Sequence, residues 1–383
     1  MKTLRLISSA LKDRYLQTHQ PKMLGDGYAF LVHPRHIQDV CRKYPFFSIL
    51  PVSVTIKILK YLWPITVSEI TGVYRSDAGE AVRGWIISTI WTPDMMMSDR
   101  EGAKQHIIKA ARLAESRGAK IIGLGGLTAS LTNGGEALLP HLRGSVTTGR
   151  VFTAKIVADI ACDAAKLLRL DVNANVAILG AAGSIGSAVA QILVSRGFKN
   201  IILIDVGKRQ ERLEKLRDLL CKKASGINVQ LVYELNILKT ADVIVAATNR
   251  PDALIRSEHV RSGAIIVDDA QPSDVSAEVR DRKDVLVFQG GVVHAPGVNV
   301  HFNIGLQHRE DIYSCLAEVV LLASINHQGH HMVGEIFELD FNSLEKLSKI
   351  GDELGFKSGE FQSNSKTYTA ADIDSVIAAR WRV

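Results

Sequence analysis

Cysteine is scarce in this chain, with four residues among 383, at positions 41, 162, 221 and 315. None lies in a Cys-x-x-Cys pair or at the cysteine and histidine spacings typical of zinc ligands, so the sequence indicates no metal site. Four widely spaced thiols are typical of reduced cysteines inside a cell and not of a disulfide framework. These absences argue against zinc-binding and disulfide-stabilised classes of protein.

The chain also lacks an uninterrupted hydrophobic run long enough to cross a membrane. Its most hydrophobic stretch, from Phe46 to Val67, is interrupted by two lysines and two prolines, Lys57, Lys60, Pro51 and Pro64. Such a stretch remains suited to contact with acyl chains or with a membrane surface. The basic segment Met1 to Lys12 lacks the apolar core and cleavage site of a secretory signal, so we expect a cytoplasmic protein.

No basic run is interleaved with aromatic residues, which argues against a nucleic acid partner. The formal net charge is +6, and this surplus is compatible both with an acidic partner and with a merely solvated basic surface. A chain of 383 residues of which 46% are hydrophobic is too long for one ordinary core and predicts two packed domains.

The most informative motif is a glycine-rich turn between a short apolar run and a helix. Val176 to Leu179 is predicted to be a buried parallel strand, and Ser184 to Ser195 the helix that follows. Glycines in the turn allow a phosphate to approach the backbone at the positive end of that helix. We assign cofactor binding to Gly180, Ala182, Gly183, Ser184, Ile185 and Gly186. Their GxxGxxG spacing is looser than GxGxxG, and a packing turn without a ligand would look similar.

Five further apolar runs favour the cofactor interpretation: Ile201–Asp205, Val229–Tyr233, Val243–Ala247, Ala264–Asp268 and Val285–Phe288. With the first strand they predict an α/β fold with a Rossmann-type, doubly wound parallel sheet. Such sheets bind ligands at the carboxyl ends of their strands, where the chain places further candidate cofactor contacts: Asp205, Lys208, Arg209, Thr248, Gly290 and Gly291. Asp205 favours NAD because it would repel a 2′-phosphate, whereas Lys208 and Arg209 are suited to hold one.

The flanking segments predict a strand at Tyr28–Val32 and a hairpin within Val67–Ile90. They also predict a helix at Asp99–Arg117, capped by Ser98 and ended by Gly118. Two further helices are predicted at Arg150–Leu168 and from about Arg309 to Asn326. We therefore expect an N-terminal α/β substrate domain over residues 1–170 and a dinucleotide domain over 171–300. A helical segment over 301–362 would return to the substrate domain. A tail over 363–383 would begin with a linker from Ser363 to Lys366.

Six short motifs carry a family resemblance: Gly123–Thr128, Thr147–Gly149, Gly180–Ala188, Gln210–Leu213, Gly290–Val293 and Cys315–Leu322. In order and approximate spacing the chain resembles the cyanobacterial long-chain acyl-[acyl-carrier-protein] reductases over residues 100 to 360. The resemblance implies an aldehyde-forming reductase in which a cysteine takes the acyl group and NADPH, with NADH as the alternative, delivers hydride. It implies a thioester of acyl carrier protein or coenzyme A as substrate, and substrate contacts from Gly125, Gly126, Thr128, Thr148 and Glu318.

The resemblance makes Cys315 the acylated residue, and a thiolate is the side chain best able to exchange with a thioester. The residues alone favour a small buried side chain, because apolar neighbours share its predicted helix face. Asp311 and Glu318 are expected at i−4 and i+3 on that helix, where their charge disfavours a thiolate. The helix dipole would oppose them only weakly, because Cys315 is expected past the first turn. Another group, such as a nearby histidine, would then have to favour the thiolate.

His294 follows the last strand of the dinucleotide domain and is a second candidate catalytic residue. It would serve either as a proton donor beside the nicotinamide or as a histidine that is merely hydrogen-bonded at a strand end. The remaining C-terminal histidines, His308, His327, His330 and His331, are expected at the surface or at helix ends, and we assign them no role.

Three other classes of protein share parts of this pattern. A nucleotide-sugar epimerase needs a Tyr-x-x-x-Lys pair, and none of the eight tyrosines has a lysine four residues later. A shikimate-type or methylene-tetrahydropterin dehydrogenase would share the two-domain plan without needing a cysteine. A non-catalytic dinucleotide-binding sensor would bind the cofactor without turnover. The last two remain alternatives.

Overall fold

The computed structural model describes residues 2–19, 24–250, 252–334, 337–359, 362–363 and 366–380. Its contacts divide the chain into two compact units. Unit 1 comprises Met1–Gly149, Ala295–Gly305 and Cys315–Glu335, and unit 2 comprises Arg150–His294, Leu306–Ser314 and Ile336–Val383. The first division therefore falls at Gly149, one helix earlier than the predicted domain boundary at residue 170.

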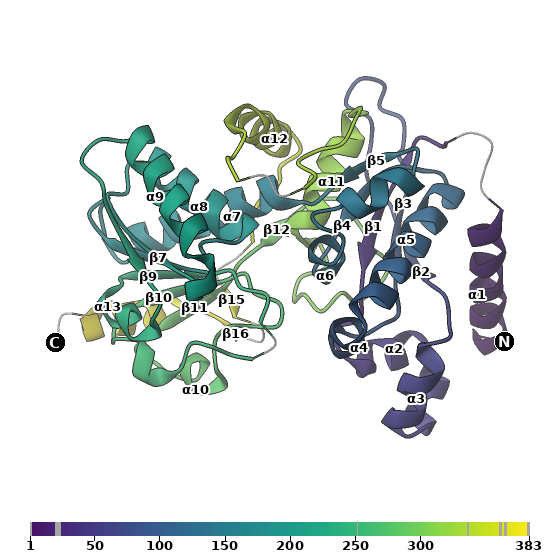
Figure 1. Cartoon of the computed structure of the whole chain (residues 1–383), viewed down its shortest axis with the longest axis horizontal. Helices are drawn as coiled ribbons and strands as arrows, with labels where there is room; N and C mark the ends of the chain where they lie inside the picture. Colours follow the sequence, from purple (N-terminus) through teal and green to yellow (C-terminus); the bar gives the residue numbers. More distant parts are fainter. Residues whose placement is uncertain are drawn as a thin grey trace. The chain divides into compact units, whose positions relative to one another are not determined.

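Unit 1 is built on a five-stranded sheet in the order β2-β3-β1-β4-β5 (Figure 1). Its strands are β1 (Gly27–Val32), β2 (Ile65–Ile70), β3 (Gly84–Ser88), β4 (Ala119–Leu124) and β5 (Ser145–Thr147). β2 runs antiparallel to β3 at one edge, and the other neighbours are parallel. The predicted first strand and the hairpin are confirmed, and the Gly79 N–H donates to the Arg75 carbonyl within the hairpin turn.

The helices of unit 1 are α1 (Lys2–Thr18), α2 (Ile37–Lys43), η1 (Pro45–Ile49), α3 (Val52–Leu59), α4 (Pro93–Ser98), α5 (Arg100–Arg117), α6 (Leu127–Ser130), η2 (Glu136–His141) and α11 (Ser314–Ser324), the last from Cys315 on. Figure 1 shows α5 and α11 on opposite faces of the sheet. On the α11 face, a Cβ atom on Gly123 would lie 2.9 Å from the Val319 Cβ, so β4 and α11 pack closely.

Helix α5 begins and ends for identifiable reasons. The Asp99 carboxylate accepts a hydrogen bond from the Gly102 N–H at 2.9 Å, whereas the Ser98 hydroxyl donates to the Met95 carbonyl. The prediction that Ser98 caps the helix is therefore wrong, because an ionised carboxylate one residue later satisfies the first turn. Gly118 ends the helix as predicted, with a φ of 104° that only glycine adopts readily.

Unit 2 contains a six-stranded, wholly parallel sheet in the order β11-β10-β9-β6-β7-β8. Its strands are β6 (Asn175–Leu179), β7 (Asn200–Ile204), β8 (Asn228–Val232), β9 (Val243–Ala246), β10 (Ile265–Asp268) and β11 (Leu286–Gln289). The order reverses between β6 and β9, which is the switch point where doubly wound sheets bind ligands. The predicted fold class is confirmed.

The helices of unit 2 are α7 (Arg150–Leu167), α8 (Ser184–Ser195), η3 (Gly207–Arg209), α9 (Gln210–Lys223), η4 (Leu235–Thr240), η5 (Ser257–His259), α10 (Ala277–Arg280), α12 (Phe341–Glu353) and α13 (Ala370–Arg380). Figure 1 shows α7, α8 and α9 on one face of the sheet and α10 on the other. Helix α8 has the bounds that the sequence predicts. Among the described residues, no helix has the length and apolar content that crossing a bilayer requires.

Unit 2 also contains a small antiparallel sheet in the order β13-β12-β14, formed by β12 (Val292–His294), β13 (Asp311–Tyr313) and β14 (Lys357–Ser358). The prediction of a helix from Arg309 is wrong at its start. Asp311 to Tyr313 pair with β12, and α11 begins only at Ser314. Ile312 and Tyr313 suit a strand, and Asp311 is buried beside His294 instead of facing along a helix.

The C-terminal segment packs onto unit 2. Ser363 and Lys366, predicted to lie in a linker, belong to β15 (Gln362–Ser363) and β16 (Lys366–Thr367), and residues 364–365 lie outside the described residues. The Tyr368 ring packs edge-on against Phe288, and its hydroxyl accepts a hydrogen bond from the Val287 N–H at 3.0 Å. Arg380 donates to the Asp242 carboxylate. The linker prediction is therefore wrong for the described positions.

Candidate active site

Two glycines of the turn after β6 are required by close packing. Gly180 has a φ of 84°, and a Cβ atom there would lie 2.6 Å from the Ala247 carbonyl oxygen after β9. A Cβ atom on Gly186 would lie 2.4 Å from the Gly180 carbonyl oxygen, so only glycine lets α8 approach the turn. The turn is thus held tightly between two neighbouring strands and the helix.

Gly183 is less constrained than these two, because its φ is ordinary and a Cβ atom there would be crowded without overlapping its neighbours. Its φ is −79°, and a Cβ atom there would contact only backbone oxygens, the nearest being that of Gly180 at 3.0 Å. In the described part of the chain no side chain caps α8, so the N–H groups at Ser184 and Ile185 begin the helix without a side-chain acceptor there. A side chain at position 183 would fill the space in front of these groups. This arrangement fits the pyrophosphate of a dinucleotide.

Asp205 lies at the end of β7 and holds the glycine turn. Its carboxylate accepts hydrogen bonds from the N–H groups of Ala182 at 3.0 Å and Val206 at 2.8 Å. The Arg209 guanidinium lies 3.9 Å from the same carboxylate, and Lys208 is exposed. The predicted acid and cations therefore lie at one edge of the sheet. The hydrogen bond from the Ala182 N–H connects the glycine turn to Asp205.

Thr248 lies next to the glycine turn at the end of β9. Its γ-methyl would be 3.2 Å from a Cβ atom on Gly180, and its hydroxyl donates to the Asp274 carboxylate at 2.6 Å. The Thr248 N–H donates to the same carboxylate at 3.1 Å. Burial raises the pKa of Asp274, although these hydrogen bonds oppose the shift. Asp274 thereby fixes the loop after β9 against the turn.

The glycine pair at 290 and 291 packs against Asp269, which follows β10. A Cβ atom on Gly291 would lie 2.2 Å from the Asp269 Oδ1 atom, and one on Gly290 would lie 3.0 Å from the Asp269 Cβ. Burial, and then the charge of neighbouring Asp268, raises the pKa of Asp269 well above its ordinary value. Burial also raises the pKa of Asp268 to about 6. Carboxyl groups that take up protons readily thus lie at the carboxyl edge of the sheet, where the sequence places Asp268 and Asp269.

Cys315 is the second residue of α11 and lies within its first turn. Two predictions about it are therefore wrong. Asp311 is a strand residue and does not flank the cysteine on a helix, and Cys315 does not lie past the first turn. The partial positive charge of a helix N-terminus stabilises a thiolate within the first turn. The side chain is partly buried, and a Cβ atom on Gly149 would lie 2.5 Å from the Cys315 Cβ.

Glu318 lies one turn further along α11 and is buried between two donors. It accepts hydrogen bonds from the Thr147 hydroxyl and from the His331 Nδ1 atom, the latter at 3.0 Å. Thr148 donates its hydroxyl to the Met332 carbonyl at 3.1 Å. The Thr147–Gly149 motif thus binds Glu318 and the segment around His331, and Gly149 packs on Cys315.

The expectation that His331 lies at the surface is wrong. Only 7% of this residue is exposed, and its N–H donates to the Val146 carbonyl beside β5. His330 is exposed as expected. Sequence reasoning missed the Glu318 and His331 pair because thirteen residues separate its members and no spacing rule connects them.

The glycine motif after β4 packs against His33, a second residue that sequence reasoning missed. The His33 Nε2 atom accepts a hydrogen bond from the Leu127 N–H at 3.2 Å, and a Cβ atom on Gly126 would lie 2.6 Å from it. Burial lowers the pKa of His33, which favours the neutral ring that this hydrogen bond requires. The Thr128 hydroxyl donates to the Gly125 carbonyl at 2.8 Å and closes the turn.

His294 is the last residue of β12 and lies opposite Asp311 of β13. Its Nδ1 atom is 3.3 Å from the Asp311 carboxylate, and its Nε2 atom is 3.9 Å from that of Glu310. The ring is about one-third exposed, so one edge faces solvent. Next to this sheet, the N–H of Ser314, the residue that precedes Cys315, donates to the Gly291 carbonyl at 2.8 Å.

The comparisons agree with this description of unit 2. The model of the family described as shikimate / quinate 5-dehydrogenase matches residues 164–289. The chain is 29% identical over 306 residues to the long-chain acyl-[acyl-carrier-protein] reductase of Synechococcus elongatus, covering 76% of this chain and 85% of that protein. These matches relate the chain to the NAD(P)-dependent dehydrogenases and reductases.

For two further relatives, the match covers a smaller share of the relative's own length. The chain is 27% identical over 289 residues to aminotransferase PigE of a Serratia species, which covers 73% of this chain but only 33% of PigE. It is 28% identical over 116 residues to the glutamyl-tRNA reductase of Methanocaldococcus jannaschii, covering 30% of this chain and 28% of that protein. The chain thus spans about a third or less of these two relatives.

Proposed function

We propose that this protein reduces a fatty acyl thioester, carried by acyl carrier protein or coenzyme A, to an aldehyde, with Cys315 as the acyl acceptor. The main support is the environment of Cys315, in the first turn of α11, against Gly149 and one turn before the buried Glu318. Similarity to a long-chain acyl-[acyl-carrier-protein] reductase over 76% of the chain supports this substrate class.

The cofactor in this proposal is NADPH. The glycine turn from Gly180 to Gly186 and the first turn of α8 would hold its pyrophosphate, and the edge formed by Asp205, Lys208 and Arg209 would hold the adenosine ribose. A nicotinamide dinucleotide bound there supplies a hydride ion. Lys208 and Arg209 lie a few residues after Asp205, and the Arg209 guanidinium is 3.9 Å from its carboxylate, so two cations are available to hold a phosphorylated ribose.

Cys315 forms and breaks the covalent bonds to the acyl group. Its thiolate attacks the carbonyl carbon, the bond from that carbon to the carrier sulfur breaks, and the carrier leaves as a thiolate that takes up a proton. Addition of hydride to the acyl carbon and of a proton to its oxygen gives a thiohemiacetal on Cys315. That oxygen then loses its proton, the carbon–Sγ bond breaks, and the aldehyde leaves with the cysteine again a thiolate. The N-terminal end of α11 stabilises this thiolate at both steps.

Two histidines are candidates for moving protons. His331 is held by Glu318 within unit 1, and His294 is held by Asp311 within unit 2. In both pairs a carboxylate fixes the orientation of the ring. His294 is partly exposed and His331 is buried, so they differ in access to solvent.

The proposal is tested by incubating the protein with palmitoyl-coenzyme A in the absence of cofactor and measuring its intact mass. We expect one palmitoyl adduct, which peptide mapping places on Cys315 and which added NADPH releases as aldehyde. The other three cysteines serve as internal controls, because Cys221 is exposed and would report non-specific acylation. An adduct on a different cysteine, or aldehyde formation without an adduct on Cys315, would contradict the proposal.

The match to the shikimate / quinate 5-dehydrogenase family supports a second candidate, a dehydrogenase of small hydroxylated acids. That match covers residues 164–289 and ends before Cys315, so it concerns only the region proposed to bind the cofactor. Such an enzyme needs no acyl-cysteine and would keep its full turnover when Cys315 is replaced by serine. Shikimate and quinate, tested with NADP and NAD, distinguish this activity from thioester reduction. Cofactor binding without turnover of either substrate class would indicate a sensor.

A further inference from the structure

An exposed apolar surface covers η1, α3 and Tyr61, which lies two residues after the end of α3. We call it the α3 patch and define it by Phe46, Ile49, Leu50, Val52, Val54, Ile56, Ile58 and Tyr61. Ile49 is 84% exposed and Tyr61 is 85% exposed. Among the described residues, seventeen large hydrophobic side chains are exposed, and these eight lie within sixteen consecutive positions. A concentration of exposed apolar side chains in one segment is typical of an interaction site.

Helix α3 presents its apolar side chains outward. Only Thr55 and Leu59 of this helix are buried, and the Thr55 hydroxyl has no hydrogen-bond partner among the residues that the structure describes. A helix at the surface of a water-soluble protein normally turns its apolar face to the core and its polar residues to solvent. Here valines and isoleucines face outward while a threonine faces inward. The packing of unit 1 therefore leaves four of the five aliphatic side chains of α3 exposed, on both sides of the lysines, where a partner can cover them.

The charges around the patch indicate what that partner is. From Val40 to Ser68 the sequence contains four basic residues and no aspartate or glutamate. Arg42 lies 3.2 Å from the Asp39 carboxylate, and Lys43 donates to the Val67 carbonyl. Lys57 and Lys60 are exposed and have no carboxylate partner in the part of the chain that the structure describes. Apolar side chains with unpaired lysines and a tyrosine between them suit the boundary of an anionic bilayer.

A second apolar stripe lies on α1. Ile7, Leu11 and Tyr15 are exposed and follow one another at intervals of four residues, which places them on one helix face. The acidic residue of this helix, Asp13, is buried on the opposite side, so the exposed charges of α1 are basic as well. This repeats the combination of features seen in the α3 patch.

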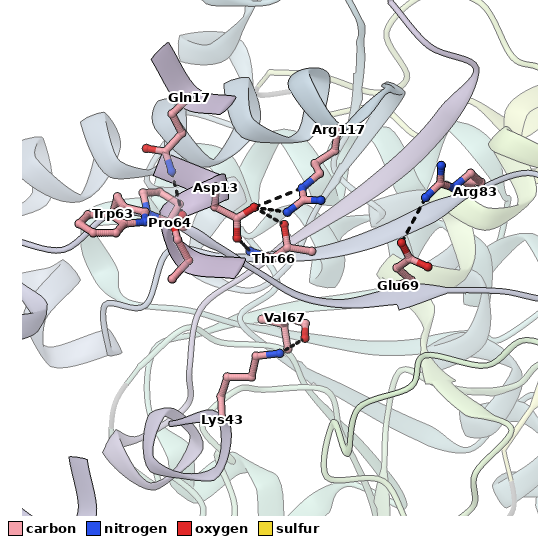
Figure 2. A network of polar contacts seen from close by, with 11 residues as sticks. Asp13, Gln17, Lys43, Trp63, Pro64, Thr66, Val67, Glu69, Arg83 and Arg117 are labelled. Carbon is pink, nitrogen blue, oxygen red and sulfur yellow. Dashed lines mark hydrogen bonds and ion pairs between the residues drawn. The ribbon is translucent and has the colours of Figure 1, made fainter. Parts of the chain in front are cut away.

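Figure 2 shows how α1 is fixed in this orientation. Asp13 accepts hydrogen bonds from the Thr66 N–H at 2.8 Å and from the Arg117 guanidinium at 2.5 Å, while Gln17 donates to the Pro64 carbonyl. The Trp63 indole N–H donates to the Ala10 carbonyl at 2.7 Å. These bonds connect α1 to the segment that follows α3, so both apolar surfaces are held by the same network.

We propose that unit 1 binds the surface of an anionic lipid bilayer through the α3 patch, with Lys57 and Lys60 at the lipid phosphates. The apolar side chains of the patch enter the boundary between headgroups and acyl chains, and the lysine stems follow them while the ammonium groups stay at the phosphates. This interaction does not depend on the proposed reductase activity.

The test is flotation of the full chain with unilamellar vesicles of phosphatidylcholine, with and without phosphatidylglycerol, in the absence of substrate. We expect binding to the anionic vesicles that weakens at high salt. The double substitution Ile49→Glu with Val52→Glu should abolish binding. Its matched control, Tyr233→Glu with Leu354→Glu, changes exposed apolar residues of unit 2 and should bind as the wild type does.

A separate variant tests how much the two lysines contribute to vesicle binding. Lys57→Gln with Lys60→Gln should weaken binding to anionic vesicles by roughly thirtyfold, since about 1 kcal/mol for each lysine near such a surface gives about 2 kcal/mol for the pair. The control Lys222→Gln with Lys239→Gln, at exposed positions of unit 2, should have no effect. Unchanged thermal unfolding and NADPH affinity in every variant verify the fold.

Three results would overturn the proposal. One is the absence of binding to any vesicle, and another is equal binding of the wild type and of the Ile49 and Val52 variant. The third is a concentration-dependent dimer in sedimentation velocity that the same glutamate pair abolishes while vesicles are not bound. That last result would assign the α3 patch to a second copy of the chain.

Discussion

Cys315 lies so close to the backbone of Gly149 that a Cβ atom on the glycine would be 2.5 Å from the Cβ of the cysteine. Real Cβ atoms do not approach other heavy atoms this closely, and the Gly149 φ of 72° also disfavours any other residue. The Thr147–Gly149 motif therefore has a physical explanation within unit 1. Its glycine makes room for the proposed nucleophile, and its first threonine binds Glu318.

Gly149→Ala should displace Cys315 and reduce the rate of acylation by roughly a hundredfold, because small misplacements of a nucleophile have effects of that size. Stopped-flow release of the carrier thiol measures this rate. Gly79→Ala is the matched control, since Gly79 also has a positive φ of 66° but a Cβ atom there would meet nothing within 4 Å. If both variants acylate at the wild-type rate, Gly149 does not position the cysteine.

Cys315→Ser should keep NADPH affinity and lose aldehyde formation almost completely. A serine hydroxyl is far less ionised than a thiol at neutral pH, and an oxygen ester is harder to reduce than a thioester. Aldehyde is measured by trapping with a hydrazine reagent. Serine at Cys41, Cys162 or Cys221 should leave turnover largely intact, apart from a packing cost at the buried Cys162. Full aldehyde production by the Cys315→Ser protein would rule out the acyl-cysteine.

The dinucleotide unit could be predicted almost entirely from local sequence. Runs such as Ile201–Ile204 and Val243–Ala246 are continuous and aliphatic because parallel strands covered on both faces are buried on both sides. The glycine turn then fixes where α8 begins, and its predicted bounds are those observed. Each of these signals lies within about ten residues, so no knowledge of distant contacts was needed.

The start of α11 and the histidine pairs depend on distant contacts, which explains why sequence reasoning failed there. Asp311 fits a helical pattern with Glu318, and only pairing with β12, seventeen residues earlier, makes it a strand residue. His331 reaches Glu318 across a loop, and His33 reaches Leu127 across 94 residues. A spacing rule describes neighbours on one element and cannot indicate such pairs.

Glu318→Gln should lower the free energy of unfolding by roughly 1.5–3 kcal/mol, because a buried carboxylate loses its charge while two donors still face it. Urea unfolding followed by circular dichroism measures the change. Glu338→Gln provides the control, since that glutamate is 64% exposed in its ion pair with Lys223 and should contribute no more than about 1 kcal/mol. Similar losses in the two variants would show that Glu318 is not a charged acceptor in the folded protein.

His106 should make unit 1 sensitive to acid. Burial lowers its pKa from 6.5 to about 4, so the unfolded chain binds its proton more readily than the folded chain between these values. Its contribution to stability is complete above pH 6.5 and is lost as the pH falls toward 4, by up to about 3 kcal/mol. The difference in unfolding free energy between wild type and His106→Gln should change across this window. Ser225→Ala, at an exposed position that does not titrate in this range, should give a constant difference.

The choice of cofactor should depend on charges at the end of β7. Asp205→Asn removes the charge that repels a 2′-phosphate and keeps one acceptor for the Ala182 and Val206 N–H groups, so affinity for NADPH relative to NADH should rise about tenfold or more. Lys208→Ala with Arg209→Ala should shift the ratio in the opposite direction, because both cations that can hold the phosphate are removed. Titrations followed by intrinsic fluorescence give the two affinities. Lys215→Ala with Arg217→Ala, further along α9, is the control and should leave the ratio unchanged. If all three variants keep the wild-type ratio, the adenosine ribose does not bind beside Asp205.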